Sequence, residues 1–186
     1  MAAQQHATPA AAEFRRPPAA IAVAPPAQEL VVRRLKPADL PAVEAHLLAL
    51  DPGGRASRFH ALLGDDAVRA YVARIDFRRM ILVGAFEEES GRLIGLAEAH
   101  LDAPEAPLRT EASVSVLASH RGAGLGRLLA GVALDAAASR GARRAEFHYQ
   151  ADNRAVARLV RGLGTPAASA PGFACLALPL GATRPH

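Results

Sequence analysis

The residues with the clearest chemical potential are three glycines at alternate positions, Gly122, Gly124 and Gly126. Because they lack Cβ atoms, the backbone N–H groups around them can approach a single anion closely. The apolar stretch before them predicts a β-strand, and Leu125 to about Arg140 predicts a helix whose positive end points at the same place. The pattern therefore predicts a strand, turn and helix that bind a pyrophosphate.

The spacing of the glycines narrows the kind of ligand. A dinucleotide fingerprint would need a further glycine where Arg127 or Leu129 stands, and a P-loop would need Gly-Lys-Ser/Thr, which does not occur. What remains is Arg121-x-x-Gly124-x-Gly126. This motif resembles the Arg/Gln-x-x-Gly-x-Gly/Ala signature of the GCN5-related N-acetyltransferase (GNAT) superfamily, whose turn holds the pyrophosphate of acetyl-coenzyme A (acetyl-CoA). A tight turn without a ligand stays open as an alternative.

The rest of the chain must position this turn, and its apolar patterns predict the elements that do so. Strands are predicted over 30–35, 80–86, 93–101, 111–117, 145–149 and 173–178. Helices are predicted over 37–50, after Gly64, over 125–140 and over 154–163, with Asp51-Pro-Gly-Gly ending the first. We expect Arg55 to Phe59 to be a surface linker. The alternative is a position beside the acceptor site, because the segment resembles a Ser-x-x-Ser-x-Tyr-x-Arg-Phe stretch in GNAT domains of bacterial protein acetyltransferases.

The predicted order β-α-α-β-β-β-α-β-α-β is similar to the GNAT fold from Val31 to Leu178. The resemblance implies a single α/β domain over residues 29–181, with a central mixed sheet, a splayed pair of strands and flanking helices. Residues 1–28 are rich in Ala and Pro and predict a disordered tail, and 182–186 a short C-terminal tail.

The resemblance also assigns roles. Glu111, ten residues before Arg121, stands where related protein acetyltransferases carry a general base. The Val116 N–H would polarise the thioester carbonyl, and Asn153 would bond the pantetheine or cap its own helix. The implied acetyl-CoA-binding residues are Ser115, Val116, Leu117, Arg121, Gly122, Ala123, Gly124, Leu125, Gly126 and Asn153.

One position departs from the family. GNAT enzymes often carry a Tyr general acid seven residues after this Asn, where Val160 stands. Because a thiol of pKa near 8.5 can leave as a thiolate, the reaction does not require that acid. Tyr149 and His148 are possible substitutes, with packing or solvent contact as the alternative for both.

Composition excludes several classes of function. The 186 residues carry 22 Lys+Arg against 18 Asp+Glu, scattered along the chain, and no Trp, so nucleic acid is not expected as a partner. No apolar run reaches the ~18 residues of a membrane span. A single cysteine, Cys175, is expected to pack as a small apolar residue and agrees with a reducing cytoplasm. We predict no metal site, and a monomer or homodimer.

Two functions follow. The first is acetyl-CoA-dependent N-acetylation of a primary amine by direct transfer, with a small-molecule amine or a protein lysine as acceptor. Glu98, Asp102 and Glu105, on or after the hairpin expected to face the acceptor, make a cationic amine conceivable. The second is a non-catalytic acyl-CoA-binding sensor, which the Val at position 160 favours.

Overall fold

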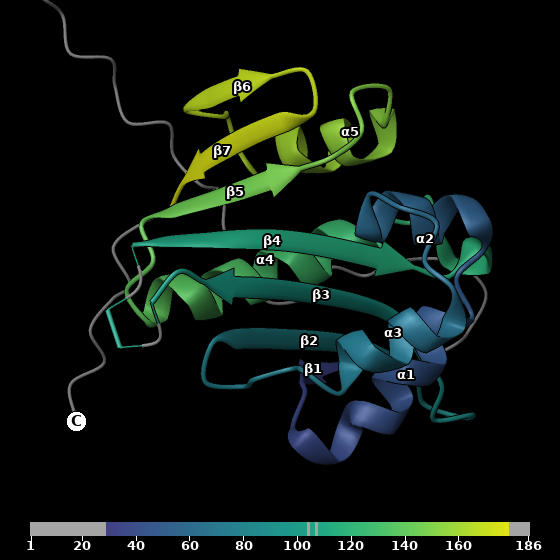
Figure 1. The fold of residues 1–186 in the computed structure, drawn as a ribbon. Helices are drawn as coiled ribbons and strands as arrows, with labels where there is room; N and C mark the ends of the chain where they lie inside the picture. Colours follow the sequence, from purple (N-terminus) through teal and green to yellow (C-terminus); the bar gives the residue numbers. More distant parts are fainter. Residues whose placement is uncertain (1–28, 104, 107, 179–186) are drawn as a thin grey trace, which may run out of the picture.

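The computed structural model describes residues 29–103, 105–106 and 108–178 (Figure 1). Its elements are β1 (Leu30–Arg34), the 3-10 helix η1 (Pro37–Asp39), α1 (Leu40–Leu48), α2 (Pro52–Phe59), α3 (Asp65–Val72), β2 (Met80–Glu87), β3 (Leu93–Leu101), β4 (Arg109–Val116), the 3-10 helix η2 (Ala118–His120), α4 (Leu125–Ser139), β5 (Arg144–His148), α5 (Arg154–Leu163), β6 (Ala168–Ala170) and β7 (Phe173–Ala177). The predicted tails, 1–28 and 182–186, lie outside the described residues.

All the strands join one mixed sheet in the order β1-β2-β3-β4-β5-β7-β6. Helices cover both faces, since side chains that alternate along β4 reach different helices. Ser115 bonds His46 of α1 on one face, and Val114 approaches Gly126 of α4 on the other. Figure 1 shows α4 running behind β3 and β4, with α1, α2 and α3 gathered at the ends of the strands in front. The predicted α/β fold with a mixed central sheet is confirmed.

The hydrophobic core lies on both sides of β2 and β3. Residues 80–86 and 93–99 are buried without a break, as expected for strands with helices on both faces. Leucines and alanines of α4 cover one side. Cys175 of β7 is buried and packs as a small residue, as predicted. No helix within the described ranges combines the length and apolar character that crossing a bilayer requires.

The sheet opens between β4 and β5. The two parallel strands pair only through Arg109–Arg144, Thr110–Ala145 and Glu111–Glu146. β4 nevertheless continues to Val116, where it still pairs with β3. A gap therefore begins just after Glu111 and extends toward the glycine-rich turn, which is the splayed pair that the family resemblance implied.

Two segments differ from the sequence prediction. The prediction of a surface linker over Arg55 to Phe59 is wrong, because these residues belong to α2. Asp51 to Gly54 begin this helix instead of ending α1: the Asp51 carboxylate accepts the Gly54 N–H at 2.8 Å, and Pro52 occupies the first turn. The strand β6, Ala-Ser-Ala, was not predicted, because three small residues carry no strand pattern.

Candidate active site

The turn after β4 has the backbone that its glycines allow. Gly122 and Gly124 have φ angles of +88° and +84°, and this left-handed conformation costs a residue with a side chain about 1–2 kcal/mol. A Cβ at either position would meet no atom within 4 Å, so the space beside the turn is open. Gly126 has a different role, since a Cβ there would lie 3.3 Å from both Leu159 and Val114. It allows α4 to pack closely against α5 and β4.

The backbone N–H groups of residues 122–127, which we call the cradle, make no hydrogen bond with any residue that the structure describes. The first helical bond comes from the Leu128 N–H, which donates to the Gly124 carbonyl at 3.1 Å. Unpaired N–H groups at a helix start, added to the positive end of the helix dipole, form an anion site. The open space and the free donors together fit a diphosphate.

Arg121 connects the cradle to α2. Its Nε donates to the Val116 carbonyl at 2.9 Å, and its Nη2 lies 2.5 Å from an Asp51 carboxylate oxygen. The Gly54 N–H and Arg121 together lower the pKa of Asp51. Asp51 also caps α2. Its ion pair with Arg121 therefore holds the start of α2 beside the cradle.

A cleft of about 1210 Å³ extends from the cradle along the gap between β4 and β5. One strand edge faces it. The Leu117 N–H donates to the Ile94 carbonyl of β3 at 2.9 Å, and hydrogen-bonding direction alternates along an antiparallel strand. The Val116 N–H therefore points away from β3 into the gap, as the oxyanion-donor prediction requires.

The predicted residues Ser115 and Leu117 flank Val116 differently. The Ser115 hydroxyl bonds His46 Nε2 at 2.8 Å, and His46 Nδ1 lies 3.0 Å from the Leu93 carbonyl. A carbonyl can only accept, so Nδ1 donates and Nε2 of the neutral ring accepts the hydroxyl proton. Burial lowers the pKa of His46 to about 4, which keeps the ring neutral. Ser115 still lines the cleft, whereas the Leu117 side chain is buried away from it.

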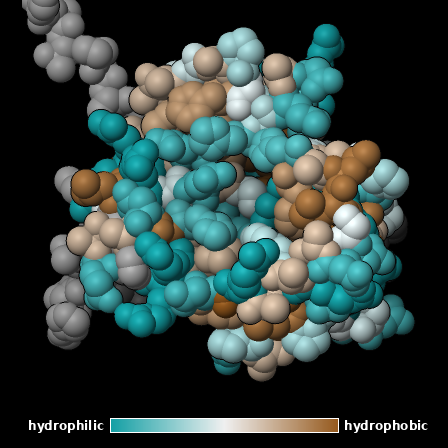
Figure 2. Space-filling view, viewed as in Figure 1, coloured by the Kyte–Doolittle hydropathy of each residue, from teal (hydrophilic) through white to brown (hydrophobic). Residues whose placement is uncertain are grey.

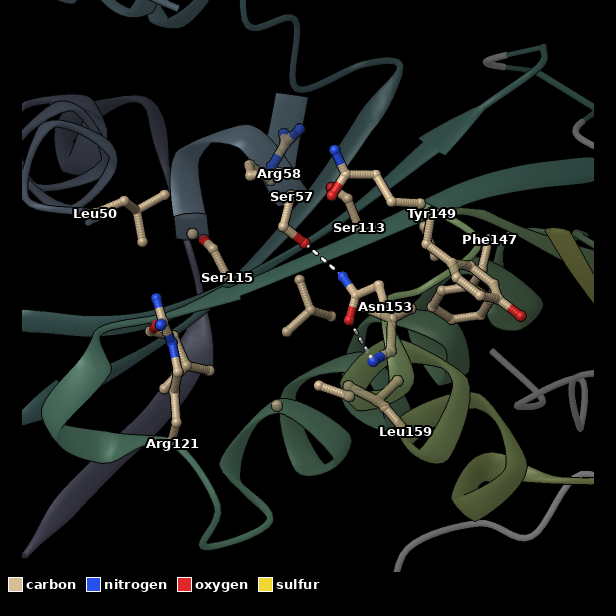
Figure 3. A pocket seen from close by; sticks show the side chains of 18 of the residues that line it. Leu50, Ser57, Arg58, Ser113, Ser115, Arg121, Phe147, Tyr149, Asn153 and Leu159 are labelled. Atoms are coloured by element: carbon tan, nitrogen blue, oxygen red, sulfur yellow. Dashed lines mark hydrogen bonds between the residues drawn. The ribbon is translucent and has the colours of Figure 1, made fainter. Parts of the chain in front are cut away.

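Asn153 spans the cleft. Its Oδ1 accepts the Val156 N–H at 3.1 Å and so caps α5, and its Nδ2 donates to the Ser57 hydroxyl of α2 at 2.7 Å. In Figure 3 this second bond crosses over β4, with Arg121 and Ser115 on one side of it. We call the part lined by Arg121 and Ser115 the near half of the cleft, and the part toward Glu111 the far half.

Glu111 lies in the far half, at the last residue pair before β4 and β5 part. Its side chain is exposed and makes no ion pair or hydrogen bond with a described residue. It is also the Cα partner of His100 on β3, and His100 lines the same cleft. The structure therefore brings the predicted base to the same cleft as the cradle.

The position of the missing tyrosine is closed to the solvent. Val160 is only 1% exposed and belongs to the hydrophobic core. The predicted substitutes, Tyr149 and His148, both line the cleft at the end of β5. Figure 3 shows Tyr149 on the far side of the Ser57–Asn153 bond.

A buried cluster of Arg58, Glu98 and Tyr71, which the sequence did not predict, borders the far half. Arg58 Nη2 donates to Glu98 Oε2 at 2.5 Å and to the Tyr71 hydroxyl at 2.7 Å, and the Tyr71 hydroxyl also donates to Glu98. Burial and the Glu98 charge both raise the pKa of Tyr71. Burial by itself would lower the pKa of Arg58, but the charge of Glu98 outweighs it and the pKa is raised. A lone carboxylate inside the apolar run of β3 is the signal that could have revealed this cluster.

The three acidic residues expected near the acceptor do not line the cleft. Glu98 is 1% exposed and paired within the buried cluster. Asp102 accepts the N–H groups of Ala103, Leu108 and Arg109 and so shapes its own loop. Glu105, 86% exposed, lies 3.6 Å from Arg78. The negative charges of these three residues therefore do not favour a cationic acceptor in the cleft.

Several solved structures share this fold. The GNAT domain of Streptomyces lividans PAT is 20% identical, with a TM-score of 0.63 over 79% of this chain and 88% of that one. A GNAT-family acetyltransferase from Streptococcus pneumoniae is 19% identical, with a TM-score of 0.60 over 81% of this chain and 100% of that one. A phosphinothricin acetyltransferase from Sinorhizobium meliloti, solved with acetyl-CoA, is 19% identical, with a TM-score of 0.61 over 84% and 93%.

No curated protein matches the sequence. The family model described as "Acetyltransferase (GNAT) family" matches residues 50–165, from the cap of α2 to the end of α5. This span includes the cradle, the splayed strands and the buried cluster. The resemblance found in the sequence is confirmed, and the chain belongs to the GNAT acetyltransferase family.

Proposed function

We propose that this chain is an N-acetyltransferase that uses acetyl-CoA as donor and passes the acetyl group directly to a primary amine, on a small molecule or a protein lysine. The observation that carries the proposal is the cradle, whose N–H groups lack partners among the described residues and face open space. Family membership supports the same reaction class. So does the Sinorhizobium meliloti neighbour, which was solved with acetyl-CoA.

Different residues of the near half would bind different parts of the acetyl-CoA donor. The N–H groups of residues 122–127 would hold the diphosphate, and the β4 edge from Ser115 to Leu117 would run beside the pantetheine. Acetyl-CoA supplies an acetyl group already activated as a thioester. The Val116 N–H, facing the gap, would stabilise the negative charge on the carbonyl oxygen, and one such donor contributes about 2.7–4 kcal/mol to transition-state stabilisation.

Glu111 would take the proton from the acceptor. An alkyl amine is mostly protonated at neutral pH and cannot attack until it loses that proton. The Glu111 carboxylate is unpaired and faces the cleft at the point where the strands part. It could accept the proton directly or through one water, which is the reach of a general base.

The departing coenzyme A thiolate does not depend on protonation by a general acid. A thiol pKa near 8.5 makes it a tolerable leaving group near neutral pH without full protonation. Tyr149 and His148 are the described cleft residues at the end of β5 that could still donate a proton. The absence of a hydroxyl at Val160 is therefore compatible with turnover.

The test is acetyl-CoA turnover with a panel of primary amines, measured by thiol release. We expect Glu111→Gln to lower kcat by about 10²–10⁴-fold, the usual loss for a general base. Glu105→Gln is the matched control, because Glu105 is exposed outside the cleft. Intersecting initial-rate plots would agree with direct transfer, and parallel plots would indicate a covalent acyl-enzyme instead.

One observation favours a second function. At position 160, where many family members carry the hydroxyl of a tyrosine, this chain carries a valine that is buried in the core. A non-catalytic acyl-CoA sensor would bind the ligand without needing an acid or a base. Tight acetyl-CoA binding with no thiol release across the panel would establish the sensor and exclude the enzyme.

A further inference from the structure

Arg58 is held rigidly at the far half of the cleft. Its Nη2 donates both to Glu98 and to the Tyr71 hydroxyl, and its guanidinium carbon lies 4.8 Å and 5.2 Å from the ring centres of Phe59 and Tyr71. The side chain is only 9% exposed. Bonds and rings together fix the orientation of the guanidinium before any ligand arrives.

Two nitrogen atoms of Arg58 remain unused. Its Nε and Nη1 make no hydrogen bond with a residue that the structure describes. Within the described ranges, no nitrogen of Arg58 is both fully buried and without a hydrogen-bond partner. The nitrogens of Arg58 are therefore not sealed in the interior, and Arg58 lines the cleft. Of the five N–H bonds of a guanidinium, about three are left for a ligand.

The register of the sheet places the buried cluster beside the proposed base. Glu98, which Arg58 bonds, pairs across the sheet with Ser113, and the next pair on the same face is His100 with Glu111. Diagonal neighbours of this kind on adjacent strands are about 7–8 Å apart. An acceptor amine at Glu111 would therefore bring any group a few bonds away within reach of Arg58.

The surface around the far half is also polar. Figure 2 shows hydrophilic side chains over β3 to β5 in the middle of this face, and hydrophobic ones gathered over α2 beside them. A small, charged acceptor would approach across the polar region. Phe59 and Arg58 of α2 both line the cleft.

We propose that Arg58 binds a carboxylate on the acceptor, so that the substrate is a small amine of amino-acid size whose carboxylate lies a few bonds from the amine. This inference rests on the N-acetyltransferase function proposed above. A carboxylate forms strong charge-assisted bonds with a guanidinium. Because Glu98 offsets the single positive charge of Arg58, the cluster offers N–H donors with no net charge, which disfavours a phosphate dianion more than a carboxylate. A lysine within a protein has no carboxylate a few bonds from its amine.

The experiment compares amines that differ only in the carboxylate, using the full chain. L-alanine is paired with ethylamine, L-phenylalanine with phenethylamine and L-methionine with 3-methylthiopropylamine, and a lysine-containing peptide is added. We expect kcat/KM for the best amino acid to exceed that of its decarboxylated partner by at least about tenfold, the effect of one hydrogen bond to a charged group. Equal efficiency within a pair, or a peptide preferred over every amino acid, would overturn the proposal.

Variants then assign the preference to Arg58. Removing Arg58 alone would leave the buried Glu98 without its counter-charge, so the main variant is the double change Arg58→Met with Glu98→Leu. We expect it to lose the carboxylate preference and keep acetyl-CoA binding. Arg55→Lys is the control, since Arg55 lies on the same helix but bonds Asp65 outside the cleft. A double variant that keeps the preference, with unchanged acetyl-CoA binding, would contradict the assignment.

A binding measurement separates this inference from the function on which it rests. Calorimetry with the same amine pairs, in the presence of coenzyme A, detects carboxylate recognition without turnover. Selective binding of the amino acid with no acetylation would support the role of Arg58 and overturn the N-acetyltransferase function. Acetylation with no selectivity in either assay would retain that function and overturn the role of Arg58.

Discussion

Two substitutions at Gly124 should separate stability from ligand binding. The residue has φ of +84° and no atom within 4 Å of a Cβ position. Gly124→Ala and Gly124→Glu therefore introduce the same backbone strain, about 1–2 kcal/mol, and the Cβ atom of either meets no neighbour. They differ in one respect: the glutamate brings a negative charge beside the unpaired N–H groups of residues 122–127.

That charge should act in opposite directions on the two properties. A carboxylate at a helix start stabilises the fold by about 0.3–1 kcal/mol, so Gly124→Glu should be at least as stable as Gly124→Ala. Against a bound diphosphate the same carboxylate is repulsive. Like charges about 4–6 Å apart near a protein surface repel by about 3–4 kcal/mol at an effective dielectric of about 20, and less after salt screening. We therefore expect about ten- to hundredfold weaker acetyl-CoA binding than for the alanine variant.

The assays are urea unfolding for stability and calorimetry for acetyl-CoA, both at moderate salt. The affinity gap between the two variants should shrink as salt rises, because screening weakens the repulsion. If Gly124→Glu binds acetyl-CoA within threefold of Gly124→Ala, the cradle does not hold the diphosphate and the reasoning fails.

Three further predictions concern residues around the cleft. Val160→Tyr should lower the free energy of unfolding by about 1–3 kcal/mol without raising kcat, because the core around Val160 is already filled; a faster enzyme would contradict the structure. Asn153→Ala should cost about 1 kcal/mol of stability, since it removes the cap on the Val156 N–H, and an unchanged urea midpoint would argue against that cap. The pKa of His46, about 4 in the fold, lies below its value of about 6.5 in the unfolded chain, so its neutral form stabilises the fold above pH ~6.5 and up to about 3 kcal/mol is lost as pH falls toward 4. His46→Gln should remove that component from unfolding curves measured between pH 7 and 4, and an equally steep pH dependence in this variant would count against a buried neutral ring.

Much of this fold could be predicted from the sequence, because its signals are local. The strand, the glycine-rich turn and the helix over 114–140 carry their own periodicity and backbone requirements. The helix cap at Asn153 is also a short-range signal. By contrast, the sequence pattern predicts a turn where α2 begins, because Pro52, Gly53 and Gly54 are poor helix formers. The correct signal was Asp51 followed by Pro, a cap and a first helical residue.

The parts that could not be predicted depend on contacts between distant residues. Arg58 meets Glu98 from 40 positions away, and Asn153 meets Ser57 from 96 positions away. No spacing rule links such residues before the helices pack on the sheet. The acidic residues expected at the acceptor show the same limit, because their sequence position did not reveal that Asp102 and Glu105 do not line the cleft. The acceptor end was therefore the least predictable part of the site.

The most direct test of the cradle is the amide NMR spectrum of the chain during an acetyl-CoA titration. Hydrogen bonding to a phosphate shifts an amide proton, so the N–H signals of residues 122–127 should move most, with that of Val116 next. They should also exchange rapidly with solvent before the ligand is added, because they lack partners within the described chain. If these amides are already protected in the free protein, or stay in place while others shift, the cradle is not the acetyl-CoA site.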